Sequence, residues 1–440
     1  MLSMDRFKHP PMLLAQNRSD TSIHTINLKI LYYHKYMIKK LLIILVIIIG
    51  LTILCFYGYN QEIPNSQIDQ ALIKRNKFKN PVISITGTCG KTTTTKFIYD
   101  IFNNFYDVDK TTLESNSFVG IPHCINKYFR LNSNYWIIEL GISKKNDMDN
   151  LLKLVQPDIR VLSKIGIAHT EYFDSESDYF KEKLKFIDNS NENTIFIING
   201  DDKIINSHVF PKKCVIIKCG FNKNNDIRIT NFQANDINSV AEIQYKNDKA
   251  KFLINGLGKY NALNLSLAIG CAISQNISFN DIKNKCKNFN LYDNRGNIIY
   301  NKDKSIFLLN HTYNSSFSAV KSNLEYLRNI DKSKNILIIL GDMAELQKID
   351  ERHEEILKQA LDITDNVIIF SILFYKRVIM DKKYNCKLFD DEGLFQECVL
   401  NHVKQIKKPL YIFLQTGNEK CRGKMPLTNI VDILQKKYIL

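Results

Sequence analysis

The sequence predicts an α/β fold: a central domain with a phosphate-binding loop and a mainly parallel sheet, a second α/β domain after it, and one transmembrane helix before both. Three observations lead to this prediction. Apolar, β-branched runs alternate with helical patterns from Pro81 onward, as in doubly wound sheets. A glycine turn followed by Lys-Thr comes directly after the first of these runs. Residues 41–59 carry no charge and are long enough to cross a bilayer core.

The phosphate-binding loop is predicted where a strand pattern, Val82–Thr86, meets a glycine turn and a helical pattern. Glycines let backbone N–H groups close around phosphate oxygens, and the helix N-terminus adds its positive end. The spacing is unusual, because Ile85 stands where G-x-x-x-x-G-K-T requires its first glycine. The alternative is a glycine turn that only opens a helix. The residues expected to contact phosphate are Gly87, Thr88, Gly90, Lys91, Thr92 and Thr93, and the Thr92 hydroxyl would also face Mg²⁺.

Composition excludes few functions but argues against nucleic-acid binding. The 440 residues predict two or three domains, and the formal net charge is +15. The charge fits an anionic partner, but scattered lysines in a Lys-, Asn- and Ile-rich chain explain it better. No basic stripe interleaves with aromatic residues, as a nucleic-acid groove would require. The ten cysteines include no C-x-x-C pair, which favours free thiols in a reducing compartment.

The N-terminal part predicts a membrane anchor at residues 37–59. Residues 1–36 show no clear pattern and are either untranslated or disordered, since Met37-Ile-Lys-Lys is typical of a translation start with a basic flank. A signal peptide and a buried soluble helix are the alternatives, but no small-residue cleavage site follows. Lysines flank the run on both sides and weakly favour a cytoplasmic N-terminus. That orientation would place the domains after the run outside the cytoplasm. ATP chemistry requires the reverse, and we expect the domains that follow to face the cytoplasm.

The remaining chain predicts a polar linker at residues 60–80, a central domain at 81–290 and a C-terminal domain at 291–440. Residues 226–255 indicate short strands, interpreted as a small β insertion. The expected strands are Val82–Thr86, Tyr135–Leu140, Val161–Ile165, Thr194–Ile198, Val215–Lys218, Ile306–Leu309, Ile336–Leu340, Val367–Phe370 and Tyr411–Leu414. The expected helices are Asp147–Val155, Asp178–Asp188, Asn261–Ala272, Ser318–Leu327, Glu351–Leu361 and Leu394–Ile406.

Two polar residues are expected beside the phosphate-binding loop. Glu139 ends a predicted strand, and a carboxylate at the carboxyl edge of a parallel sheet is a candidate Mg²⁺ ligand. His169 follows another strand and would reach the same edge, although a lone histidine is more often structural. Lys181, Lys183 and Lys185 lie on one predicted helix, where a solvated basic face is the plain interpretation.

Taken together and in order, a series of stretches resembles the Mur ligase family, the ATP-dependent enzymes that add amino acids or a dipeptide to the peptidoglycan precursor. The similarity covers about residues 81–440 and is greatest to the member that adds D-alanyl-D-alanine. The matching stretches include Thr86-Gly-Thr-Cys-Gly-Lys-Thr-Thr93, Asn116-Ser-Phe-Val-Gly-Ile-Pro122, Ile165-Gly-Ile-Ala-His-Thr-Glu-Tyr-Phe173, Tyr179-Phe-Lys-Glu-Lys183, Gly258-Lys-Tyr-Asn-Ala-Leu-Asn264, Thr312-Tyr-Asn314 and Leu340-Gly-Asp-Met-Ala-Glu-Leu346. The first and the last of these, and the order of the whole series, are highly specific, whereas the other single matches are not.

The resemblance implies an ATP- and Mg²⁺-dependent ligase that forms an amide bond through an acyl phosphate, with a C-terminal Rossmann-like domain. It implies that Lys91 contacts the transferred phosphate and that Lys183 is carbamylated. The implied metal ligands are Thr92, Glu139, His169 and Lys183. The implied adenine-side residues are Asn261 and Asn264, with Arg295 reaching the nucleotide from the last domain. Tyr313 and Asn314 match the side of the incoming amine, and the implied substrates are a muramoyl peptide and an amino acid or dipeptide.

Three departures from the family pattern leave alternatives open. The family's N-terminal domain, which holds the UDP end of the precursor, has no counterpart, and the apolar run and linker stand in its place. Tyr260 replaces a histidine of the adenine motif, and Asn310-His311 replaces an acidic residue. One alternative is an anchored amide ligase of the polyglutamate or capsule type. Another is a nucleotide-binding partner protein without catalytic activity.

Overall fold

The computed structural model describes residues 65–113, 115–313, 315–330, 334–343, 346–372, 375, 384–417 and 426–439. The expected segment 1–36 and anchor 37–59 lie outside these residues, and so does Asn314. Within the described part, no helix combines the length and the apolar character that crossing a membrane requires. The described residues belong to one unit, Ile63–Leu440.

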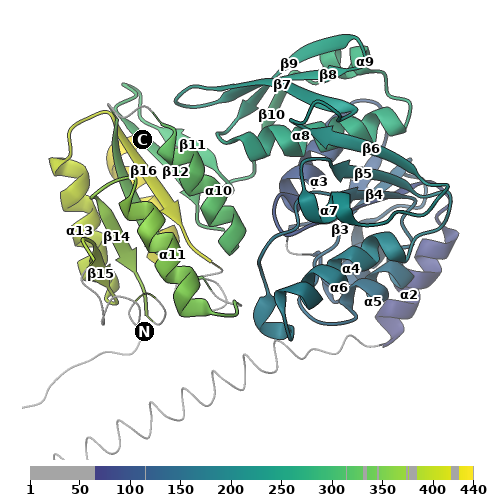
Figure 1. Ribbon diagram of the computed structural model, residues 1–440, viewed down its shortest axis with the longest axis horizontal. Helices are drawn as coiled ribbons and strands as arrows, with labels where there is room; N and C mark the ends of the chain where they lie inside the picture. The colour runs from purple at the N-terminus through teal and green to yellow at the C-terminus, as the bar shows by residue number, and fades with distance from the viewer. Residues whose placement is uncertain are drawn as a thin grey trace, which may run out of the picture. The chain divides into compact units, whose positions relative to one another are not determined.

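The larger sheet contains ten strands in the order β10-β9-β8-β7-β6-β5-β4-β1-β3-β2 (Figure 1). Neighbours from β2 to β7 are parallel, β7, β8 and β9 pair antiparallel, and β10 is parallel to β9. The strands are β1 (Val82–Thr86), β2 (Val108–Lys110), β3 (Tyr135–Glu139), β4 (Ile159–Leu162), β5 (Ile195–Asn199), β6 (Val215–Gly220), β7 (Ile227–Ala234), β8 (Ser239–Tyr245), β9 (Asp248–Asn255) and β10 (Asn288–Asn290).

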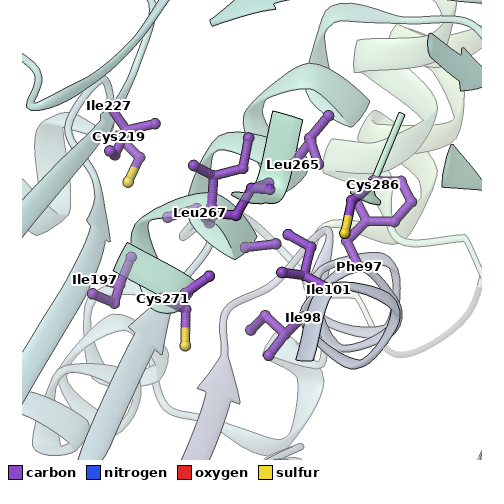
Figure 2. Packing of buried hydrophobic residues seen from close by; sticks show 14 of the residues in the cluster. Phe97, Ile98, Ile101, Ile197, Cys219, Ile227, Leu265, Leu267, Cys271 and Cys286 are labelled. Carbon is purple, nitrogen blue, oxygen red and sulfur yellow. The ribbon is translucent and has the colours of Figure 1, made fainter. Parts of the chain in front are cut away.

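Helices cover both faces of this sheet, because successive residues of its central strands point to opposite sides. In β1, Ile83 and Ile85 pack with α3 and α8, whereas Val82 packs with α2, α4, α5 and α6. Figure 2 shows the first of these cores, in which Ile101 of α3 and Leu265 of α8 take part. The helices are α2 (Asn65–Lys77), α3 (Lys91–Phe102), α4 (Gly120–Tyr128), α5 (Asp147–Val155), η1 (Thr170–Tyr172), α6 (Glu176–Asp188), α7 (Lys203–Ser207), α8 (Lys259–Ser274) and α9 (Phe279–Lys285).

The linker predicted at residues 60–80 is wrong over most of its length, because α2 occupies it. Arg75 is 8% exposed, and its Nε donates to the carbonyl of Val155 at 2.6 Å. Phe78, directly after the helix, stacks on Trp136 with the ring centroids 3.9 Å apart. The sequence signal was weak because the side chains that α2 itself buries are Ala71 and Arg75, a small and a charged residue.

The smaller sheet has six strands in the order β11-β12-β16-β13-β14-β15, all parallel except for the β11–β12 pair. α10 and α11 cover one face, and α13 and α14 cover the other. The elements are β11 (Asn297–Tyr300), β12 (Ile306–His311), α10 (Phe317–Arg328), β13 (Asn335–Gly341), α11 (Ile349–Leu361), β14 (Val367–Phe370), β15 (Lys387–Phe389), α13 (Glu392–Gln405), β16 (Leu410–Gln415), α14 (Pro426–Leu434) and η3 (Gln435–Ile439).

The structure confirms an α/β fold with a large, mainly parallel sheet, and it corrects one detail. Residues 226–255 are not a separate β insertion, because β7 pairs with β6 and thereby extends the main sheet. β7, β8 and β9 then continue it as two antiparallel pairs. The eight cysteines in the described part of the chain are free thiols.

Candidate active site

The phosphate-binding loop lies between β1 and α3, and its backbone requires glycine at two positions. Gly87 and Gly90 have φ angles of 146° and 86°, which side-chain-bearing residues rarely adopt. A β-carbon at Gly87 would collide with the Ser163 hydroxyl, and one at Gly90 with the Asn264 carboxamide. The two glycines therefore allow a tight turn directly before the N-terminus of α3, and a phosphate cradle needs this backbone arrangement.

Lys91 is the first residue of α3, and its ammonium folds back over the loop. Its Nζ donates to the carbonyl of Thr88 at 3.3 Å. Burial lowers the pKa of Lys91, and the guanidinium of Arg295 lowers it further, while the Glu139 carboxylate acts in the opposite sense. Lys91, Glu139 and Arg295 therefore share one electrostatic environment, although they come from three distant parts of the chain.

Glu139 ends β3 beside the loop, because it pairs in register with Ile85 of β1. The residue is 6% exposed, and the side-chain amide of Asn116 donates to its Oε1 at 2.8 Å. Its backbone N–H donates to the Thr111 hydroxyl at 3.1 Å. The carboxylate is thus held in place by residues that precede β3, and Asn116 is a site residue to which the sequence analysis gave no role.

Thr88 joins the phosphate-binding loop to the segment after β4. Its hydroxyl accepts from the N–H of Gly166 at 3.0 Å, and it lies 3.1 Å from the hydroxyl of Tyr179 on α6. His169 lies further along this segment, with φ 52° and ψ 22°, a left-handed conformation that is uncommon for residues other than glycine. His169 therefore lies in the segment that Thr88 contacts at Gly166, and its backbone is left-handed.

Lys183 is a buried lysine, 1% exposed, whose Nζ lies 5.3 Å from the ring centroid of Tyr179. Among the described residues its Nζ has no hydrogen bond or ion pair. Burial lowers the pKa of Lys183 well below its ordinary value, and the Lys91 ammonium lowers it further, against the carboxylates of Asp147 and Glu139. Burial in this environment therefore favours the neutral amine of Lys183 more than an exposed position would.

The two neighbouring lysines behave differently. Lys181 has a side chain that is 73% exposed and pairs with Asp178 at 3.3 Å. Lys185 pairs with Asp149 at 2.6 Å and with Glu182 at 2.8 Å. Of the three lysines, Lys183 alone therefore faces the phosphate-binding loop.

The predicted adenine-side residues lie on α8. Asn261 is 1% exposed, and its side-chain amide donates to the carbonyl of Leu257 at 2.7 Å. The amide nitrogen of Asn261 therefore already has a hydrogen-bond partner in the protein. Asn264 contacts the phosphate-binding loop at Gly90 instead. Burial raises the pKa of the Tyr260 hydroxyl, and a hydrogen bond with Asn261 opposes the rise.

Arg295 and Tyr313 form a stacked pair, with the guanidinium carbon 4.1 Å from the ring centroid. Asn310 supports the turn that carries Arg295, because its Nδ2 donates to the Asn294 side chain at 2.6 Å. Its Oδ1 accepts from both the N–H and the hydroxyl of Thr312. The side-chain oxygen of Asn310 therefore accepts the hydrogen bonds that an aspartate carboxylate could also accept. Its amide nitrogen adds a donor that aspartate lacks.

Of the four predicted metal ligands, Thr92 and Glu139 are the two whose side chains suit Mg²⁺ as they stand. Within the described ranges, no group of three or more His, Cys, Asp or Glu side chains could hold a metal. The oxygens of Thr92 and Glu139 are ligands of the type that Mg²⁺ prefers. An ammonium group repels a cation, so Lys183 fits only after conversion to an anion.

Comparison with known proteins places residues 85–272 in one family, since they match the Mur ligase middle domain. The UDP-N-acetylmuramoyl-tripeptide–D-alanyl-D-alanine ligase of Bacillus subtilis is 27% identical over 278 residues, which cover 62% of this chain and 59% of the relative. The match thus spans less than two thirds of that relative.

Two solved structures share the fold. The MurF ligase of Thermotoga maritima in complex with ADP has a TM-score of 0.74 at 22% identity, covering 85% of this chain and 83% of that one. The folylpolyglutamate synthase of Mycobacterium tuberculosis, complexed with ADP and AMPPCP, has a TM-score of 0.63 at 11% identity, covering 85% and 96%.

Proposed function

Because residues 85–272 match the Mur ligase middle domain, we propose that this chain is an ATP-dependent ligase that joins a carboxylate to an amine in peptidoglycan precursor synthesis. One observation carries the proposal: Lys91 at the phosphate-binding loop, Glu139 at the next strand end and the buried Lys183 share one electrostatic environment. Each of these groups is costly to bury, and such clusters mark functional sites.

The proposed reaction has two steps. A substrate carboxylate oxygen attacks the γ-phosphorus of ATP, so that ADP leaves and an acyl phosphate forms. The amine nitrogen of the second substrate then attacks the acyl carbon, loses a proton and displaces inorganic phosphate. Mg²⁺ supplies positive charge to the phosphate oxygens when it is bound, and Thr92 and Glu139 would hold it.

The protein's own residues bind, orient and neutralise charge in this scheme. The Lys91 ammonium stabilises negative charge on the transferred phosphoryl group, in a site where burial strengthens the interaction. Asn261, Asn264 and Arg295 are proposed to hold the nucleotide. Tyr313, whose ring lies against Arg295, and Asn314 are proposed on the side of the incoming amine.

A product-balance assay tests the function. Residues 61–440 would be incubated with ATP, Mg²⁺, muramoyl peptides and either D-alanyl-D-alanine or single amino acids, with ADP, phosphate and amide measured separately. We expect all three products in equal amounts for one acid–amine pair. ADP release without amide formation would contradict a ligase, and no ADP with any pair would contradict an enzyme of this class.

A second candidate is an amide ligase of the polyglutamate type, favoured by the fold shared with folylpolyglutamate synthase. The same assay separates the two, because that enzyme class would accept glutamate as the amine and a glutamyl peptide as the acid. A nucleotide-binding protein without catalytic activity would bind ATP and release no phosphate.

We further propose that residues 37–59 anchor the chain in a membrane with the α/β domains in the cytoplasm. The support is the uncharged run of residues 41–59 in the sequence and the cytoplasmic supply of ATP. Protease treatment of intact and opened cells tests the orientation. The C-terminus should be cut only after opening, and cutting from outside intact cells would contradict the proposal.

A further inference from the structure

Three successive backbone N–H groups after β4 donate to side-chain oxygens from three distant segments. The N–H of Ile165 donates to Oδ2 of Asp202 at 2.9 Å, and that of Gly166 donates to the Thr88 hydroxyl at 3.0 Å. The N–H of Ile167 donates to the Ser318 hydroxyl at 2.9 Å. Asp202 caps α7, Thr88 belongs to the phosphate-binding loop, and Ser318 lies in the first turn of α10.

The other end of the same segment is held by Gln347. The backbone N–H of Gln347 donates to the hydroxyl of Thr170 at 3.0 Å. Its side-chain amide donates to the carbonyl of Phe173 at 2.6 Å. Gln347 directly precedes the turn into α11, and α10 and α11 pack against each other on one face of the smaller sheet (Figure 1).

His169 therefore lies between two clamps that come from the C-terminal part of the chain. Ser318 holds the backbone two residues before it, and Gln347 holds the residue after it. The left-handed backbone of His169, φ 52°, costs free energy for a residue other than glycine and persists only where neighbouring contacts enforce it. Contacts on both sides supply that enforcement.

We propose that Ser318 and Gln347 are positioning residues for His169, which keeps its left-handed backbone in the segment 165–173 only while α10 and the turn before α11 are docked on that segment. The proposal rests on the proposed ligase function, together with the metal-ligand role that the family resemblance implies for His169. It assigns two residues outside the predicted site to the support of His169. The hydrogen bonds of Ser318 and Gln347 add to the apolar packing of Ile167 against the core of the smaller sheet.

A variant pair on one helix separates positioning from helix stability. Ser318→Ala removes the hydroxyl that accepts from Ile167. Ser322→Ala, one turn later, removes a hydroxyl that donates only to the carbonyl of Ser318 within α10. For the second clamp, Gln347→Ala is matched by Gln359→Ala, whose side chain contacts Glu355 on its own helix.

The first measurement does not depend on activity. Site-resolved hydrogen exchange of residues 61–440 should show the Ile167 amide exchanging about three- to tenfold faster in Ser318→Ala than in wild type, as expected for one lost hydrogen bond. Ser322→Ala should leave this amide unchanged. Equal protection of Ile167 in wild type and Ser318→Ala would overturn the positioning role.

The second measurement is the Mg²⁺ dependence of turnover with the acid–amine pair that wild type accepts. Ser318→Ala and Gln347→Ala should each lower kcat about three- to tenfold and raise the Mg²⁺ concentration for half-maximal rate, with ADP affinity within twofold. Ser318→Thr should keep a rate near that of wild type, because threonine retains the hydroxyl that accepts from the Ile167 N–H. An unchanged kcat with faster Ile167 exchange would overturn the link to His169. If wild type forms no amide but the Ile167 amide exchanges faster in Ser318→Ala, the ligase proposal fails, whereas the role of Ser318 in holding the segment 165–173 is supported.

Discussion

The side-chain carboxamide of Asn264 occupies the space that a β-carbon at Gly90 would need. Asn264 is 4% exposed and lies within α8, so it cannot move aside freely. Gly90→Ala should therefore distort the phosphate-binding loop through both this collision and the φ angle of 86°. We expect ADP affinity to fall at least tenfold, measured by calorimetry on residues 61–440.

The matched control for Gly90→Ala is Gly393→Ala in α13, where a β-carbon would meet one side-chain oxygen at 3.3 Å. The control should bind ADP as wild type does. Wild-type affinity in Gly90→Ala would show that the loop does not form the nucleotide cradle.

Lys91→Ala should abolish turnover, because the ammonium at the head of α3 is lost from a site where burial strengthens its field. The expected loss of kcat is about 10²–10⁴-fold, as for a lost charge on a transferred phosphoryl group. Phosphate release measures it. Lys96→Ala, on the same helix and paired with Asp100 at 2.7 Å, is the control and should keep most activity. A Lys91→Ala enzyme within a few-fold of wild type would falsify the catalytic assignment.

Lys183→Ala should lose activity that short carboxylates restore. A neutral, buried amine reacts with CO₂ to give a carbamate, and the resulting anion would support Mg²⁺ at the site. Activity would be measured in CO₂-depleted buffer, with added bicarbonate, and with acetate for the variant. We expect bicarbonate to activate wild type and acetate to rescue Lys183→Ala in part.

The neighbouring lysines provide the controls for this test. Lys181→Ala breaks an ion pair with Asp178 at the surface, and Lys185→Ala breaks the pairs with Asp149 and Glu182. Both variants should change activity little, because neither lysine is buried as Lys183 is. Full activity of Lys183→Ala without CO₂, or failure of acetate to rescue an inactive variant, would exclude the carbamate.

Helix α2 should be required for the stability of the large domain. Removing residues 1–60 should leave a folded, soluble protein, whereas removing residues 1–80 should unfold or aggregate it, since Phe78 and Arg75 are lost from the core. Phe78→Ala alone should cost about 3–5 kcal/mol of unfolding free energy. Urea unfolding measures both effects, and Ile73→Ala, an exposed position on α2, is the control. An equally stable 81–440 chain would contradict an integral α2.

His311 should make the smaller sheet sensitive to acid. Burial lowers the pKa of His311 to about 3, from an ordinary value near 6.5. The folded state therefore favours the neutral ring, and its stabilising contribution is complete above about pH 6.5 and is lost as pH falls towards 3. Wild type should lose up to about 1.4 kcal/mol per pH unit below 6.5 from this group.

The comparison variant for the acid test is His311→Gln, which can keep a contact with Asn323, 3.2 Å from Nδ1 of the ring. Unfolding free energies at pH 7, 6 and 5 should fall less steeply in this variant than in wild type. Parallel curves for the two proteins would show that His311 does not carry the acid sensitivity.

The sequence predicted the strands well because they are short apolar, β-branched runs between turns, as in Val367–Phe370. It also predicted Glu139 at the carboxyl edge of the sheet, where its register with Ile85 of β1 puts it, because parallel strands end together. It missed α2, whose buried side chains include a charged Arg75 rather than an apolar stripe. Arg75 is buried because its guanidinium donates to the backbone carbonyls of Val155 and Gln156 at the end of α5. A buried charged residue of this kind does not contribute to the apolar periodicity by which a helix is recognised in a sequence.

The site predicted from the sequence also lacked Ser318 and Gln347, whose contacts join residues that are far apart along the chain. Ser318 and Ile167 are 151 positions apart, and Gln347 and Thr170 are 177 apart, so no local pattern connects them. The choice among Lys181, Lys183 and Lys185 was also open, because spacing alone does not fix which helix face is buried. Side-chain burial decides it in the structure, with Lys183 inside the domain.

Trp136 is the only tryptophan in the sequence, and it lies three residues before Glu139 on β3. Its indole N–H donates to the carbonyl of Arg130, and Phe78 covers one face of its ring. The molecule thus carries a built-in fluorophore whose emission reports on one place, where α2 meets the strand that ends in the proposed metal ligand. Undocking of α2 would shift that emission to longer wavelength by exposing the indole to water.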